Sequence, residues 1–133
     1  FEVNTDSYKA VLDQGEFYYY AAGSKSFDLK YRLTSVAMGA DRIDIGEPVK
    51  VKSSETVLCN YYDVISESYT LKSKGIEQCW VINQRPRLSG DVVIEGRIES
   101  PHRVSSSSLG GVNFIDGRGQ IILSKQNFYN KSF

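Results

Sequence analysis

The chain has 133 residues, of which 41% are hydrophobic and 24% are charged. This is the composition of a globular protein long enough to bury a hydrophobic core, and it excludes a disordered chain. The 16 basic and 16 acidic residues balance, and the lack of a basic block argues against a nucleic-acid-binding protein. The longest apolar run, from Phe17 to Ala22, is far too short to span a membrane. We therefore expect a single domain over residues 1–133.

The sequence favours an exported protein. It begins at Phe1 rather than at Met, as a chain would after removal of a signal peptide, although a trimmed chain would look the same. In an exported domain two cysteines most simply form one bridge, whereas in a cytosolic protein they can be two unrelated buried thiols. We expect a disulfide between Cys59 and Cys79 that closes a loop of about 20 residues and contributes about 3 kcal/mol. The expected location is the periplasm or the outside of the cell.

Residues 5–15 fit two kinds of secondary structure. Thr5 or Asp6 can cap a short helix that stops at Gly15. Alternate apolar residues of the same segment fit one face of a strand about as well, namely Tyr8, Ala10 and Leu12. Both alternatives stay open at the level of sequence.

From Glu16 onward the hydrophobic pattern has a period of two, which predicts strands. The alternation is clearest in residues 27–37, which is typical of a half-buried strand in an antiparallel sheet. In residues 76–83, Cys79 and Val81 are expected on one face and Trp80 on the other. The predicted strands are residues 16–21, 27–37, 42–45, 49–52, 56–65, 67–74, 76–83, 91–99, 112–115 and 120–123.

Three features of the C-terminal third complete the predicted fold. Gly96 marks a bulge or a close approach in a strand whose apolar residues Val92, Ile94 and Ile98 are expected to align. Residues 116–119, Asp-Gly-Arg-Gly, predict a hairpin turn. Residues 100–111 have no pattern and predict a long loop. About eight to ten short strands with frequent turns predict an all-β, antiparallel sandwich or barrel.

The sequence contains no recognisable catalytic or metal-binding motif. His102 is the only histidine, and no serine lies in a G-x-S-x-G turn. One histidine and two cysteines do not match a zinc pattern, and the glycine-rich segments lack the lysine of a phosphate-binding loop. The acidic residues of strand 91–99 alternate with apolar ones, as on a solvated strand face. We expect a protein without catalytic activity and without a cofactor or metal.

Recognition of a protein partner remains as the expected role. Tyrosines at the surface give rigid contact area at low entropic cost, and Arg85 and Arg87 on a proline-stiffened loop suit carboxylates. A loop as long as residues 99–111 tends either to bind something or to be disordered. The residues expected to contact a partner are Glu99, Arg103, Ser107, Leu109, Arg85, Arg87 and Tyr62.

In its size, β content and single pair of cysteines, the chain resembles periplasmic immunity proteins, which neutralise cell-wall-degrading effectors of bacterial type VI secretion systems. The resemblance covers the general build of the whole chain and rests on no motif, so no site residue is transferred. It implies a non-catalytic inhibitor that covers the substrate cleft of a peptidoglycan hydrolase. Several proteins of this family are dimers, so a homodimer is also implied.

Two other functions fit the same pattern. One is a structural subunit of a surface fibre or pilus, although Phe1–Thr5 is short for a donor strand. The other is a carbohydrate- or lipid-binding domain in which Trp80 and the tyrosines form stacking platforms. Trp80 directly follows Cys79, which favours a place in the core instead.

Overall fold

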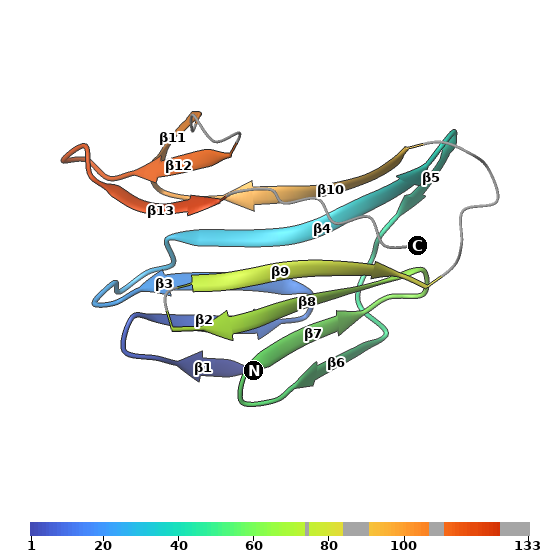
Figure 1. Cartoon of the computed structure of the whole chain (residues 1–133), viewed down its shortest axis with the longest axis horizontal. Coiled ribbons are helices and arrows are strands. Elements are labelled where there is room, and N and C mark those ends of the chain that lie inside the picture. The colour runs from blue at the N-terminus through green and yellow to red at the C-terminus, as the bar shows by residue number, and fades with distance from the viewer. Residues whose placement is uncertain (74, 84–90, 107–110, 126–133) are drawn as a thin grey trace. The chain divides into compact units, whose positions relative to one another are not determined.

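The computed structural model describes residues 1–73, 75–83, 91–106 and 111–125, and within these ranges it contains thirteen strands and no helix (Figure 1). The strands form three antiparallel sheets, and none of the sheets closes into a barrel. The predicted all-β antiparallel class is therefore confirmed, and the barrel alternative is wrong. No described element is a helix long and apolar enough to cross a membrane.

The chain divides into two compact units, Phe1–Glu99 and Ser100–Phe133. The first unit contains two sheets and the second contains the third sheet. The single domain expected over residues 1–133 stays a prediction.

The first sheet has the strand order β1-β2-β3-β4-β10, and β5 pairs with the C-terminal half of β4. The alternating residues of β2 face the core, with exposed fractions of 2% at Tyr8, 0% at Ala10 and 1% at Leu12. The helix alternative for residues 5–15 is therefore wrong, because a strand buries all three side chains on one face. The strands are β1 (Glu2–Asn4), β2 (Tyr8–Asp13), β3 (Glu16–Ala21), β4 (Leu29–Met38), β5 (Asp41–Asp44) and β10 (Val92–Glu99).

The second sheet has the order β6-β7-β8-β9. The turn between its second and third strands comes earlier in the chain than predicted, because residues 56–65 do not form a single strand. The amide of Tyr62 donates to the carbonyl of Ile65 over 2.9 Å, which closes a turn before β8 begins. The strands are β6 (Lys50–Ser53), β7 (Val57–Tyr61), β8 (Ile65–Lys72) and β9 (Gly75–Ile82).

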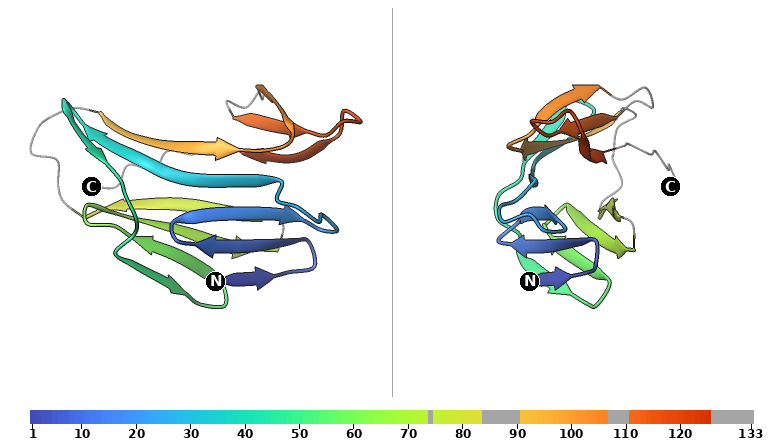
Figure 2. Two further views of the ribbon diagram at one scale, coloured as in Figure 1. Left: turned by 180° about the vertical axis from the view of Figure 1, so that it is seen from behind. Right: turned by 90° about the vertical axis from the view of Figure 1, so that its left-hand side faces the viewer.

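The two sheets of the first unit pack face to face and enclose its core (Figure 2). Phe17 of the first sheet stacks on Tyr69 of the second, with ring centroids 4.0 Å apart and planes 5° from parallel. Leu33, Leu58 and Ile65 are fully buried, and each such side chain contributes roughly 1.5–3 kcal/mol by leaving water. The sandwich arrangement is thus held by large apolar groups from both layers.

The pairing of β10 with β4 contains the predicted irregularity, a register shift between Glu95 and Gly96. Glu95 pairs with Ser35 and Gly96 pairs with Leu33, so the extra residue is Thr34 of β4 and the alternation along β10 is not interrupted. Val92, Ile94 and Ile98 therefore lie on one face of β10, as predicted. The phenol of Tyr31 lies over Gly96, where a Cβ atom would overlap it.

The second unit contains a three-stranded meander of β11 (Arg103–Ser106), β12 (Val112–Ile115) and β13 (Ile121–Lys125). The predicted hairpin at residues 116–119 is confirmed, since it joins β12 to β13. The loop predicted for residues 100–111 is wrong in part, because β11 lies within it and pairs with β12. Together β1, β2 and β11 account for the strands beyond those predicted.

Candidate functional site

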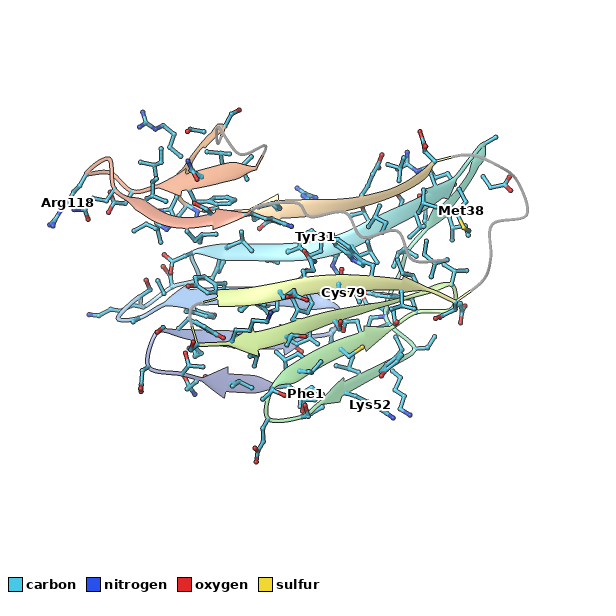
Figure 3. All side chains as sticks on the ribbon, viewed as in Figure 1. Phe1, Tyr31, Met38, Lys52, Cys79 and Arg118 are labelled. Atoms are coloured by element: carbon cyan, nitrogen blue, oxygen red, sulfur yellow. The ribbon has the colours of Figure 1, made fainter. Side chains whose placement is uncertain are left out.

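The two cysteines lie on the second sheet and are both free thiols. Ser68 of β8 pairs with Cys59 on one side and with Cys79 on the other. Adjacent strands are about 4.8 Å apart, so the two Cα atoms are separated by about 10 Å, and a disulfide requires less than about 7 Å. The predicted disulfide is therefore contradicted. Cys79 is exposed on β9 (Figure 3), whereas burial raises the pKa of the Cys59 thiol.

Four of the residues expected to contact a partner lie outside the described residues, namely Arg85, Arg87, Ser107 and Leu109. Glu99 ends β10, and its carboxylate lies 3.8 Å from Lys30 Nζ and 4.0 Å from Arg97 Nε. Glu99 thus belongs to a network of ion pairs on the first unit, where its charge is already balanced.

Tyr62 lies in the core, with 5% of its surface exposed. At least one ring of the Tyr61–Tyr62 pair was expected at the surface, and the ring of Tyr62 is buried. Burial raises the pKa of its phenol, to which the nearby Glu67 carboxyl adds. In this conformation Tyr62 cannot contact a partner.

The most buried charged residue of the described chain is Glu67 in β8, which is fully enclosed. The indole N–H of Trp80 donates to Oε2 over 2.8 Å, and the hydroxyl of Tyr69 donates to Oε1 over 2.8 Å. The side-chain amides of Asn60 and Gln78 donate to the two oxygens, each over 3.4 Å. Four neutral groups therefore replace the water that a carboxyl would bind at the surface.

Burial raises the pKa of the Glu67 carboxyl, and the hydrogen bonds from Trp80, Tyr69, Asn60 and Gln78 oppose part of this rise. A raised carboxyl pKa is common in catalytic acids. A general acid, however, must come within hydrogen-bonding reach of a substrate. Glu67 has no exposed surface, and its oxygens are occupied by core donors. We interpret this cluster as part of the scaffold.

A hollow of about 360 Å³ lies within the second unit, between the start of β11 and the β12–β13 turn. Arg103, which the sequence singled out, lines it together with the neighbouring His102. The opposite wall contains Asp116, and Gly117 and Gly119 leave the backbone there uncovered by side chains. Ile115 and Pro101 complete the lining. Polar, basic and backbone groups therefore converge on one small open hollow.

The turn beside this hollow is held by the side chain of Asp116. Its Oδ1 accepts hydrogen bonds from the amides of Arg118 over 2.9 Å and Gln120 over 3.0 Å. The backbone amides of Asp116 and Gly119 close the turn further, and Gly119 adopts a φ of +80°, which favours glycine. The bonds from Gln120 and Arg118 lower the pKa of Asp116, so it is ionised at neutral pH and keeps the turn rigid.

Arg118 occupies the tip of this hairpin and points away from its strands (Figure 3). Both Arg118 and Arg103 are exposed, and neither forms an ion pair with a carboxylate among the described residues. In the first unit the described arginines are all paired with carboxylates, Arg32 with Glu16, Arg42 with Glu95 and Arg97 with Glu99.

The chain is neutral as a whole, but its two units carry opposite net charges. Residues 1–99 contain 12 basic and 15 acidic residues, whereas residues 100–133 contain 4 basic residues and one acidic residue, Asp116. The first unit thus carries a net charge of −3 and the second a net charge of +3. The Asp116 carboxylate accepts hydrogen bonds from amides of its own turn and also interacts electrostatically with Arg118 and His102.

Within the described ranges, no three or more side chains of His, Cys, Asp or Glu are grouped so that they could hold a metal ion. Comparisons with protein families, with curated protein sequences and with solved structures found no match for this chain.

The sequence reasoning identified Arg103 but missed the group around it. Residues 116–119 were interpreted only as turn formers, although the arginine between two glycines was a signal for an exposed basic tip. Glu67 was missed as well. Its signal was its position between Ile65 and Tyr69 at a spacing of two, which places all three on one face of a strand.

Proposed function

We propose that this chain is a non-catalytic, exported binding protein that inhibits an enzyme which degrades the bacterial cell wall. The observation that carries the proposal is the contrast between its polar groups. Glu67, the group with the most acid-like environment, is enclosed by the core. Exposed polar groups of the second unit, by contrast, line the hollow beside the β12–β13 turn.

The hairpin has the properties of a binding element rather than a catalytic one. Asp116 fixes the turn through two backbone amides, so a partner would not have to order it on binding. Pre-organisation of this kind improves affinity because it reduces the entropic cost of association. Arginine is also enriched among the residues that dominate binding energies at protein interfaces. These features support a role in blocking a partner's active-site cleft.

The environment of Trp80 does not favour the alternative of a carbohydrate-binding domain. Its indole N–H donates to the buried Glu67 carboxyl over 2.8 Å, and the side chain is half-buried against the sandwich. A stacking platform for a sugar needs an open ring face, and this ring is held in place by the core instead.

The proposal is tested with purified cell-wall hydrolases encoded beside the gene for this chain. We expect one of them to form a stable complex on size-exclusion chromatography and to lose peptidoglycan hydrolysis when the chain is added. Asp116→Ala should weaken the complex, because the turn amides lose their acceptor. Asp44→Ala, an exposed acidic residue of the first unit, is the matched control and should inhibit as well as the unchanged chain. If no hydrolase is bound or inhibited, the proposed function is wrong.

A further inference from the structure

The charge of the second unit indicates what kind of surface it can bind. Its net charge is +3, and neither arginine of its described part lies within ion-pair distance of a described carboxylate, in contrast to the paired arginines of the first unit. An arginine presents a planar fork of donors that matches a carboxylate with two parallel hydrogen bonds. The second unit thus presents arginines that can bind carboxylates of another molecule.

Two structural elements hold Arg118 and Arg103 in a fixed geometry. Arg118 lies at the tip of a turn whose backbone is held by Asp116, and Arg103 lies in the hollow beside the same turn. Arg103 is also fixed along the sheet, where it pairs with Ile115. Two exposed arginines are therefore held at one turn and beside it, which suits a partner surface with more than one acidic group.

We infer that the β12–β13 hairpin and its adjacent hollow form a docking surface for a carboxylate-rich surface of a protein partner, with Arg118 and Arg103 as its anchors. The inference rests on the proposed function in one respect, namely that the chain binds a protein. It adds the location of the interface and the chemistry of the partner. A catalytic cleft lined by Asp and Glu side chains would have this chemistry.

The observations favour a protein over a nucleic acid as the occupant. Nucleic-acid-binding proteins commonly neutralise about six to ten phosphates, and residues 100–133 contain only four basic residues. Two arginines at a rigid turn are instead enough to recognise two or three carboxylates on a folded partner, since a few anchors dominate most protein interfaces.

The inference can be tested by titrating the full chain, labelled with ¹⁵N, with hexaglutamate and following its amide resonances. We expect shifts at Arg103 and at residues 116–120, and an affinity that falls as salt is added. Arg118→Gln and Arg103→Gln should each weaken binding about fivefold, the effect of losing one exposed ion pair. Arg118→Lys, which keeps the charge but not the fork, should lose less than Arg118→Gln.

Arg42→Gln is the control, because Arg42 is an exposed arginine of the first unit that is paired with Asp44 and Glu95. It should bind hexaglutamate as the unchanged chain does, and the resonance pattern of each variant reports whether it is folded. Shifts confined to residues 1–99, or no shifts at millimolar peptide, would overturn the inference. Tighter binding of hexathymidylate at the same residues would also overturn it, in favour of a nucleic-acid site.

This experiment separates the inference from the proposed function. If hexaglutamate binds at the hairpin but no cell-wall hydrolase is inhibited, the docking surface stands and the proposed function is wrong. If a hydrolase is inhibited and Arg103→Gln combined with Arg118→Gln leaves its inhibition constant unchanged, the function stands and this inference is wrong.

Discussion

The two units use charged side chains in opposite ways. In the first unit, arginines such as Arg32 lie within ion-pair distance of one or more carboxylates. In the second unit, Arg103 and Arg118 have no such partner among the described residues, and the carboxylate of Asp116 binds backbone amides of its own turn. The first unit thus pairs its described arginines with its own carboxylates, whereas the second unit leaves positive charge for another molecule.

Within the first unit, two acidic residues have opposite environments. Glu16 lies on the first unit beside Lys30 and Arg32, and the hydroxyl of Tyr18 donates to it over 2.6 Å. Chiefly because of this hydrogen bond, the pKa of Glu16 is lowered. Glu67 in the core has no cation among its hydrogen-bonding partners, and burial raises its pKa. Thus even within the first unit, cations balance the charge near the surface and neutral donors replace water in the core.

The largest expected effect comes from removing the acceptor at the centre of the first unit. Glu67→Ala leaves four buried donors without a partner and opens a cavity, so it should lower the free energy of unfolding by about 3–5 kcal/mol. Urea unfolding followed by far-ultraviolet circular dichroism measures this. Glu77→Ala in the neighbouring strand, where Glu77 is exposed and paired with Lys72, is the control and should cost less than about 1 kcal/mol. Equal costs would show that the cluster is not part of the scaffold.

Titration of the Glu67 carboxyl should have a smaller effect, which is seen in how the free energy of unfolding changes with pH. Because its folded pKa is raised, the protonated form is favoured in the folded chain. Its contribution to stability is complete below the unfolded value of about 4.3 and is lost as the pH rises through the folded pKa. Unfolding free energies measured from pH 4 upward should therefore fall more steeply for the unchanged chain than for Glu67→Gln, which does not titrate. Parallel curves would contradict the assigned direction of the shift.

The smallest effect should separate the arginines of the two units. Arg32→Gln removes contacts to Glu16 at 3.2 Å and Glu47 at 3.6 Å, and because these groups are partly exposed it should cost up to about 1 kcal/mol. Arg103→Gln removes no ion pair within the described part of the chain and should change stability by less than about 0.5 kcal/mol. Urea unfolding at low and high salt measures both, and salt should weaken only the Arg32 contribution. A larger loss for Arg103→Gln would reverse the comparison.

The sequence predicted the fold well where alternation was strong. Leu29, Tyr31 and Leu33 are buried on one face of β4, and Trp80 and Cys79 occupy opposite faces of β9 as expected. Strand β11 could not be found in the same way, because it contains serines that carry little strand preference. It forms because β12 supplies its hydrogen-bonding partner, which is a tertiary effect.

The remaining errors arose where sequence spacing does not determine contact in space. Residues 56–65 look continuous because Tyr62 extends the aromatic pattern, yet the chain turns there. The disulfide was predicted from the number of cysteines, but only the strand order shows that Ser68 separates Cys59 from Cys79. The hollow around Arg103 depends likewise on the pairing of β11 with β12, so only Arg103 itself could be anticipated.

The contact between Tyr31 and Gly96 has a consequence for how this sequence can vary over time. The phenol occupies the space that a side chain at position 96 would need, so the two positions cannot change independently. Gly96→Ala alone should be rejected, yet it should become acceptable once Tyr31 is replaced by a much smaller residue. Related chains should therefore show paired changes at these two positions, with a bulky residue on one strand accompanied by glycine on the other.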